Sequence, residues 1–476
     1  MLLLRPASRT SIHVASSRAF SSCVAQRVPP RPFLFTPLPT RALLAVSGPD
    51  SPKFLQGLVS NDVRKVHQAT DERNDRDRVI YAALLQADGR YMSDFFLHSH
   101  PDPADPSVPS FLIDHPASQT PHIRSYLKRH VLRSKLKLAK DRETTWQVVQ
   151  VWRNPDRGRH GSDRDEARER ETRAERWLEE HGIGRDPRFI GMGWRGIWQQ
   201  GQDGDPTDFP SDLFARSTPN HYHLHRLVHS IPEGPLDFPA LPLEANLDLM
   251  NGVDYRKGCY VGQELTARTK HKGVVRKRGV ALRLFREGEE TPDSLLPGPE
   301  PSLIPSPNLF PVPPPGSSLT LLPPSSTSNP SSTSSSTTTT KPRRPRAPRS
   351  SGKLGEALPV VTQSGATVTF AFGSVNLQHL EQSESGPPPI FVVTPPSSET
   401  APSTETSPTS PPDEASATQS DSTLTGPTRT GHEKVGEQGL TQDEHDQGGR
   451  WFAKGFVSDW VEFRLEEDEI AKGLRG

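Results

Sequence analysis

The residue types best suited to chemistry are concentrated in one segment of the 476-residue chain, Lys257-Gly-Cys-Tyr-Val-Gly-Gln-Glu264. It combines an amine, a thiol, an amide and a carboxylate with two glycines, which allow a positive φ or a close approach of the backbone to a ligand. A helix-compatible run begins at Gln263, so Cys259 should lie just before a helix N-terminus with Lys257 nearby. Both features favour a thiolate. The alternative is a small buried hydrophobe, the commonest fate of a free cysteine. The residues indicate a pocket-like site and name no reaction.

Helices and strands are both expected in the chain before this segment. Strand-like apolar runs alternate there with runs that have apolar residues at helical spacing, and Ala87-Asp-Gly-Arg90 between two apolar runs is typical of a hairpin. The pattern lacks long parallel βαβ units and therefore predicts α+β layers. The expected strands cover 41–46, 79–86, 91–97, 111–114 and 136–139, and the expected helices cover 52–58 and 118–130.

Beyond Gly273 the apolar runs are short and strand-like. They predict a small barrel or sandwich whose loops have expanded into polar inserts, which makes this domain discontinuous in sequence. The runs cover 280–285, 366–372, 390–393 and 456–463.

Composition excludes several classes of protein. Only 32% of the residues are hydrophobic and mean hydropathy is −0.65, and no run approaches the ~20 apolar residues of a membrane span. The 57 basic and 57 acidic residues balance, which argues against a protein built around nucleic-acid backbone. Two cysteines, Cys23 and Cys259, exclude a disulfide scaffold and a self-contained four-cysteine metal site.

Two segments are too polar to fold. In 291–350, 38 of 60 residues are Pro, Ser or Thr, and 392–450 contains no aromatic residue. Segments of this kind lack the apolar area that offsets chain entropy, so both are predicted to be disordered. A third segment, 153–176, carries eight arginines and seven acidic residues and is either a solvated helix or a polar loop.

The N-terminus has the composition of an import signal. The first 49 residues contain no Asp or Glu but carry six arginines and many serines, and their apolar run is too short for a secretory signal. This predicts a mitochondrial targeting leader over residues 1–31. The alternative is a basic tail. Cleavage within 20–31 would remove Cys23 and leave one cysteine in the mature protein.

The segment 257–264 resembles the signature of the YgfZ-type proteins, folate-binding relatives of the glycine-cleavage T-protein (aminomethyltransferase). The mitochondrial branch of that family comprises iron–sulfur cluster assembly factors. Further blocks occur in the family's order, namely 46–50, 54–62, 85–94, 129–134, 186–191, 242–248 and 273–278.

The resemblance implies an α+β fold, a three-lobed T-protein-like ring with two α+β lobes and a C-terminal β-barrel lobe interrupted by disordered inserts. The folate-binding, T-protein-like N-terminal region is expected over 36–272, with 153–176 as a polar insert. The barrel lobe is expected to combine 273–290, 351–391 and 451–470, and the disordered inserts are 291–350 and 392–450.

The resemblance also implies a folate-sized central pocket. Tetrahydrofolate is the expected cofactor, and no stably bound metal is expected in the isolated protein. T-protein enzymes carry two adjacent aspartates where this chain has Ser93-Asp94, so one carboxylate of the pair is absent. The candidate catalytic residues are Cys259 and Asp94; the candidate cofactor-binding residues are Asn61, Lys257, Gly258, Tyr260, Gly262, Gln263, Glu264 and Arg268.

The function implied is that of a mitochondrial matrix assembly factor for [4Fe–4S] proteins such as aconitase and lipoate synthase. Its expected partners are A-type iron–sulfur scaffold proteins and client apoproteins, with no nucleic acid and no membrane span. One mature cysteine fits a helper better than a scaffold, because a cluster needs about four ligands. The alternatives are a tetrahydrofolate-dependent one-carbon (aminomethyl-type) transferase and an adaptor that recruits partners through its proline-rich inserts. Whether the chain is an enzyme stays open at this point.

Overall fold

Three sheets organise the computed structural model. It describes residues 31–67, 78–100, 105, 107–140, 146–155, 164–199, 208–297, 303–322, 350–381, 389–396 and 449–473. The predicted leader lies outside the described residues except for Arg31, and so do most of the two predicted inserts. No helix within the described ranges is long and apolar enough to cross a membrane.

The first lobe is an antiparallel five-stranded sheet whose side chains alternate between two cores. Leu44, Ile80 and Phe95 face a core beneath the helices, whereas Leu43, Tyr81 and Phe96 face the centre of the molecule, as the two-residue period of a strand requires. The strand order is β3-β4-β5-β2-β6. The strands are β2 (Arg41–Ser47), β3 (Val79–Leu85), β4 (Tyr91–Ser99), β5 (Ser110–Pro116) and β6 (Lys137–Lys140), and the helices are α1 (Ser51–Gln56), α2 (Arg64–His67) and α3 (Thr120–Val131).

The second lobe has a five-stranded sheet with an aromatic core that includes Phe33, Trp194 and Trp198. Within 153–176, the described residues from Arg164 onward are helical, and their helix buries only Ala174 and Leu178. The strand order is β10-β1-β7-β9-β8. The elements are β1 (Phe33–Pro37), β7 (Trp146–Arg153), α4 (Arg164–Glu180), β8 (Gly184–Arg185), β9 (Trp194–Gln199), β10 (Phe214–Arg216) and α5 (Pro219–Val228).

The third lobe is a closed barrel of six antiparallel strands. The order β14-β13-β16-β17-β11-β15 closes through the pairing of β14 with β15, and a short strand β12 adds to β14 from outside. The strands are β11 (Lys277–Arg286), β12 (Ile304–Pro305), β13 (Ser318–Leu321), β14 (Gly352–Val361), β15 (Thr367–Asn376), β16 (Ile390–Thr394) and β17 (Trp451–Phe456). The α+β fold with two mixed lobes and a C-terminal barrel is therefore confirmed.

Two sequence predictions about this lobe are wrong. The segment 291–350 is not disordered throughout, because Ser318–Leu321 is a barrel strand that buries Leu319 between β14 and β16. Four residues with one inward leucine are too short a signal to stand out among prolines and serines. The apolar run 456–463 is not a strand, since β17 ends at Phe456 and the helix α8 (Asp459–Gly473) follows.

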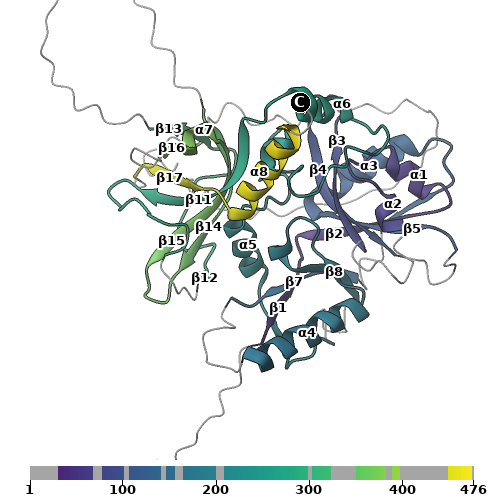
Figure 1. Cartoon of the computed structure of the whole chain (residues 1–476), viewed down its shortest axis with the longest axis horizontal. Coiled ribbons are helices and arrows are strands. Elements are labelled where there is room, and N and C mark those ends of the chain that lie inside the picture. The colour runs from purple at the N-terminus through teal and green to yellow at the C-terminus, as the bar shows by residue number, and fades with distance from the viewer. Residues whose placement is uncertain are drawn as a thin grey trace, which may run out of the picture.

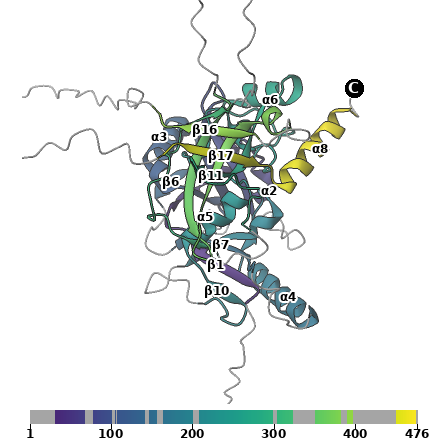
Figure 2. The same cartoon turned by 90° about the vertical axis from the view of Figure 1, so that its left-hand side faces the viewer.

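The lobes meet around the segment that connects α5 to the barrel. The central hydrophobic cluster draws residues from both sheets, from the barrel and from α8, including Phe96, Trp152, Leu243, Phe370 and Trp460. The helix α8 lies between the barrel and α6 (Gln263–Lys272), and it projects from the body of the molecule (Figures 1 and 2). Two short helical turns, α7 (Gln378–Glu381) and the 3₁₀ turn Pro242–Ala245, complete the barrel side.

Candidate functional site

Residues 257–262 form an irregular loop that leads into α6, which contains the last two residues of the segment 257–264. Lys257 and Tyr260 are buried, whereas Gly258 and Cys259 between them are exposed. Cys259 is a free thiol at the surface, so the alternative that it is a small buried hydrophobe is wrong. The helix begins at Gln263 as predicted, with Glu264 in its first turn and a basic last turn, an order that matches the helix dipole.

Gly262 is required by packing inside the chain. Its φ of +78° lies in the left-handed region, and an added Cβ would lie 2.4 Å from the Gln86 carbonyl oxygen and 2.8 Å from the Leu85 Cβ. The start of α6 therefore rests on the turn between β3 and β4, where Gly89 also has a positive φ. This packing explains why a glycine occupies position 262 without reference to a bound ligand.

Lys257 is likewise engaged within the chain. Its ammonium donates to the carbonyl oxygens of Gln56, Val59 and Asn61 at 2.8, 2.6 and 2.8 Å. A lysine has three N–H donors, so none is left for Cys259 or for a cofactor. Burial lowers the pKa of Lys257 to about 8, while Asp62 and Asp254 act in the opposite direction.

The other predicted residues of this region divide into buried and exposed groups. Asn61 is buried and donates to the carbonyl oxygens of Tyr81 and Asn251, both at 2.8 Å. The Tyr260 hydroxyl lies 3.0 Å from the Thr266 hydroxyl. Glu264 and Arg268 are exposed on α6 and Gln263 is half-buried. The structure thus brings Asn61, Lys257 and Tyr260 together as internal supports.

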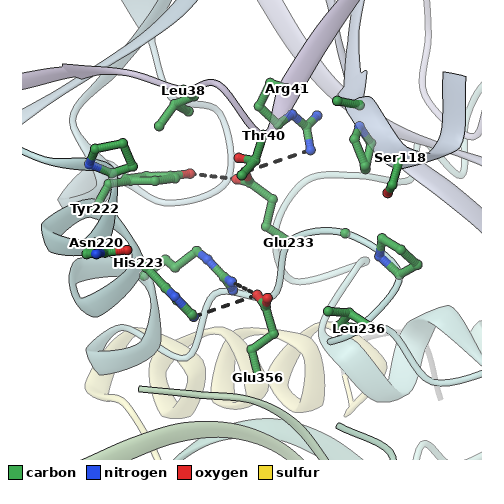
Figure 3. A pocket seen from close by; sticks show the side chains of 16 residues that line it. Leu38, Thr40, Arg41, Ser118, Asn220, Tyr222, His223, Glu233, Leu236 and Glu356 are labelled. Carbon is green, nitrogen blue, oxygen red and sulfur yellow. Dashed lines mark hydrogen bonds and ion pairs between the residues drawn. The ribbon is translucent and has the colours of Figure 1, made fainter. Parts of the chain in front are cut away.

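A separate pocket of about 340 Å³ lies where the three lobes meet. Arg41 reaches it from the first strand of the first lobe, Tyr222 and His223 from α5, and Glu356 from the barrel (Figure 3). Glu233 comes from the loop after α5. The helix α5 is well defined by its sequence, because Pro219 opens it and the Thr218 hydroxyl accepts a bond from the His221 amide.

Glu233 is the carboxylate on which this pocket converges. One oxygen accepts bonds from Tyr222 Oη at 2.6 Å and from Arg188 at 2.8 Å, with Arg195 at 3.5 Å. The other oxygen lies 3.7 Å from Arg41. Burial alone would raise the pKa of Glu233, but the surrounding arginines outweigh it and hold that pKa well below its usual range.

Behind the pocket wall, the inner faces of the two sheets enclose buried ion pairs. Asp114 on β5 accepts bonds from Arg41 and from Arg195 on β9, both at 2.6 Å. Burial alone would raise the pKa of Asp114, but the two arginines outweigh this effect. The pKa of Asp114 is therefore well below its ordinary value. The Phe96 ring lies beneath three guanidinium groups, with Arg195 nearest at 3.9 Å. Such groups stay charged only because each is paired.

Asp94 belongs to this buried network and not to the loop of Cys259. It is fully buried and accepts bonds from the Tyr91 hydroxyl at 2.8 Å and the Gly234 amide at 2.9 Å. Its other oxygen lies 3.6 Å from Arg41 without a hydrogen bond. Asp94 does not line the pocket, so the two candidate catalytic residues lie in different places.

At the barrel side of the pocket, Arg226 binds both Asp237 and Glu356. His223 lies 3.6 Å from Glu356. Burial holds the pKa of His223 well below its ordinary value, so this imidazole is neutral at physiological pH. Burial also raises the pKa of Glu356, against the effect of Arg226. This wall therefore offers a neutral ring and a carboxylate whose charge is only partly compensated.

The donor set suits a small polar ligand. Arg41 has a buried nitrogen without a hydrogen-bond partner beside the Glu233 oxygen that is not bound by Tyr222 or Arg188. A pocket of about 340 Å³ with charged side chains on its wall has the size and polarity of a small-molecule site. Within the described part of the chain, no three His, Cys, Asp or Glu side chains are placed to hold a metal ion.

Sequence reasoning did not identify most of this pocket. Arg41, Asp114 and Glu233 carried no motif, whereas Asp94 and Asp186-Pro-Arg188 in the network behind the pocket lay within recognised blocks. A usable signal existed in the strands, because a charged residue inside an apolar run must find a partner when the strand is buried. Asp114 at the end of Phe111–Asp114 is such a residue.

Comparison with protein-family models gives no match. The chain is 39% identical over 261 residues to the mitochondrial iron–sulfur cluster assembly factor IBA57 homologue of Mycosarcoma maydis, covering 54% of this chain and 59% of that protein. It is 31% identical over 344 residues to the homologue of Neosartorya fischeri, covering 67% and 74%. It is 35% identical over 267 residues to mitochondrial IBA57 of Mus musculus, covering 54% and 68%.

Among solved structures, aminomethyltransferase T of the glycine cleavage system from Bartonella henselae matches with a TM-score of 0.39 and 11% identity, over 76% of this chain and 82% of that one. A likeness of this size carries no argument about fold or activity.

Fold and site together define a class, a three-lobed α+β protein with a small-molecule-sized pocket at the junction of its lobes. The alignments that span two thirds or more of a relative settle the family. The chain belongs to the IBA57 family, as the 257–264 segment had indicated. The matched region spans 59% of the Mycosarcoma maydis protein and 58% of the Neurospora crassa protein.

Proposed function

We propose that this protein is a mitochondrial iron–sulfur cluster assembly factor that supports maturation of [4Fe–4S] proteins such as aconitase and lipoate synthase in the matrix. The observation that carries the proposal is membership of a family whose relatives are named mitochondrial iron–sulfur cluster assembly factors. The acid-free, arginine-rich leader supports the location.

The exposed thiol of Cys259 supports a role in handling clusters as cargo. A cluster needs about four ligands, and the described residues offer one free cysteine and no group of three metal-binding side chains. A cluster held at Cys259 would therefore take its remaining ligands from a partner. The partners we propose are A-type scaffold proteins and client apoproteins.

Tetrahydrofolate is the ligand we propose for the central pocket. Arg41, Glu233 and Glu356 would hold its polar groups, and His223 would form part of the wall. When bound, this cofactor would supply a carrier for one-carbon units. Asp94 is bound to Tyr91 and Gly234 and lies outside the pocket lining, so no free carboxylate of the T-protein type faces the ligand. This favours assembly over aminomethyl-type transfer.

Complementation tests the assembly function. Cells depleted of their own family member would receive the full chain, and aconitase activity and protein lipoylation would be compared with citrate synthase, which contains no cluster. We expect the chain to restore the first two and leave the third unchanged. Cys259→Ser should fold normally, because the side chain is exposed, and should fail to restore either. Normal client activity with Cys259→Ser would remove the thiol from the mechanism.

Titration tests the pocket. Calorimetry with tetrahydrofolate should show binding by the purified chain, weakened by His223→Ala. His221→Ala is the matched control, because it lies on the same helix but does not line the pocket. Equal binding by both variants would place the ligand elsewhere. A purified chain that transferred an aminomethyl group to tetrahydrofolate would favour the transferase alternative.

A further inference from the structure

The ammonium of Lys257 is buried among backbone carbonyl oxygens. The residue is 5% exposed, and its three acceptors are the carbonyl oxygens of Gln56, Val59 and Asn61. Gln56 is the last residue of α1, and Val59 and Asn61 lie in the irregular chain between α1 and α2. A buried carbonyl without a donor costs about 1–3 kcal/mol, so a side chain with three converging donors suits this position.

Further bonds join the same two parts of the chain. The Ser60 hydroxyl donates to the Gly252 carbonyl at 2.5 Å, and the Asn61 amide donates to the Asn251 carbonyl at 2.8 Å. The backbone adds Asp254 N to Ser60 O at 3.0 Å and Val261 N to Gly57 O at 3.1 Å. The loop that carries Cys259 is therefore attached to the first lobe before and after the thiol.

Two residues project between Lys257 and Tyr260. Gly258 and Cys259 are exposed, while Lys257 on one side and Tyr260 on the other are buried. The Lys257 ammonium lies 5.0 Å from the centre of the Tyr260 ring, so the two anchors also contact each other. A two-residue projection between packed anchors has little freedom to move.

We propose that Lys257 is a positioning residue, whose ammonium fixes the loop on segment 56–61 and thereby sets where Cys259 stands on the surface. The position of the loop follows from the contacts above, whereas the effect of Lys257 on client activation rests on the proposed function. Lys257 is two residues from the thiol, and two residues of chain span up to ~7 Å. Functional groups need to be held to within about 0.5 Å, so release of this anchor would matter.

A distance measurement tests the geometry directly. In the full chain with Cys23→Ser, Cys259 is the single cysteine and can carry a nitroxide. A second nitroxide on Lys128→Cys, exposed on α3 of the first lobe, gives the distance by double electron–electron resonance. Lys257→Met removes all three donors at similar length, and Lys257→Gln keeps two. Lys53→Met, exposed on α1, is the control for loss of one positive charge.

We expect one narrow distance distribution for the parent and for Lys53→Met. Lys257→Met should broaden or shift it by several ångström, up to the ~7 Å reach of the freed chain, with Lys257→Gln in between. In complementation with unlabelled protein, Lys257→Met should lower client activation by about tenfold or more, as removal of groups that orient metal ligands does.

A purely structural role predicts a different result. Lys257→Met would then lower the melting temperature but leave the distribution narrow at temperatures where the variant is folded, and that outcome overturns the proposal. If Lys257→Met does not fold, an unchanged distribution in Lys257→Gln overturns it equally. A parent chain that fails to restore client activity contradicts the proposed function, while the distance measurement still decides the role of Lys257.

Discussion

Arg195 on β9 of the second lobe donates through Nε to Asp114 on β5 of the first lobe, at 2.6 Å, with both side chains fully buried. The bond directly links the two sheets through residues that are 81 positions apart in the sequence. Asp114 also accepts a hydrogen bond from Arg41 through its other oxygen. One carboxylate therefore compensates two buried guanidinium groups at the junction behind the pocket.

Asp114→Asn should destabilise the fold strongly. The amide keeps the shape of the side chain but leaves Arg41 and Arg195 without their shared charge, and breaking a buried pair in this way costs about 3–5 kcal/mol. Asp212→Asn is the matched control, since its pair with Arg173 is exposed and worth about 0–1 kcal/mol. Denaturant unfolding measures both. Equal losses for the two variants would contradict a central role for Asp114.

Stability should also fall at mildly acidic pH because of buried histidine. Burial lowers the pKa of His229 to about 4, whereas an unfolded histidine titrates near 6.5. The unfolded state therefore binds the extra proton first as the pH falls from about 6.5 to about 4, and it gains up to about 1.4 kcal/mol per pH unit in that window.

Unfolding free energies at pH 7, 6, 5 and 4 measure this slope. His229→Gln should reduce it, and His122→Gln, exposed on α3, should not. If the free energy of unfolding of His229→Gln falls with pH as steeply as that of the parent, groups other than His229 cause the acid sensitivity.

Gly262→Ala should cost more than a positive φ alone explains. Placing alanine in the left-handed region costs about 1–2 kcal/mol, and here the new Cβ would also meet the Gln86 carbonyl. Gly288→Ala separates the two effects, because Gly288 has a φ of +89° and no atom within 4 Å of an added Cβ. The difference between the two melting temperatures measures the packing of α6 on the β3–β4 turn. Identical values would contradict that packing.

At Gly258, unlike at Gly262, a larger side chain should leave the stability of the fold unchanged. An added Cβ would meet nothing within 4 Å and its φ is not in the left-handed region, so the fold itself does not require glycine there. Gly258→Val should leave the melting temperature and the alkylation of Cys259 by a small reagent nearly unchanged. It should reduce client activation, because the new side chain stands beside the thiol where a partner must approach.

Gly449→Val is the control for Gly258→Val, since Gly449 is equally unobstructed and equally free of positive φ. Client activation that survives Gly258→Val would mean that the partner does not approach the backbone at this point.

The elements that sequence reasoning identified are those with strong local signals. The hairpin around Ala87–Arg90 and the helix that begins at Gln263 follow from turn residues and periodicity, and both are present. β13 was missed because its apolar residues are few and its pairing depends on distant strands. Local pattern does not encode such pairing. The start of α8 was predicted as a strand because the apolar run 456–463 is too short to show a helical period.

The candidate site also has one part that the sequence reveals and one part that it does not. The 257–264 segment is visible because unusual residue types lie next to one another, and the family assignment followed from it. The central pocket is not visible, because Arg41, Tyr222, Glu233 and Glu356 come from four separated elements. The partners of Lys257 are not visible in the sequence either: the sequence places an amine two residues from a thiol, and only the fold shows that backbone carbonyls accept its hydrogen bonds.

The barrel holds the ends of its two long connections side by side. Leu319 pairs with Gly352 on either side of the connection from β13 to β14, and Val393 pairs with Trp451 on either side of the one from β16 to β17. Chain that leaves and returns at neighbouring hydrogen-bonded positions can change in length at small entropic cost, about 0.6 kcal/mol for each doubling. The lobe therefore tolerates insertion and deletion at these two points. The number of residues in the protein can change there without a change in the barrel.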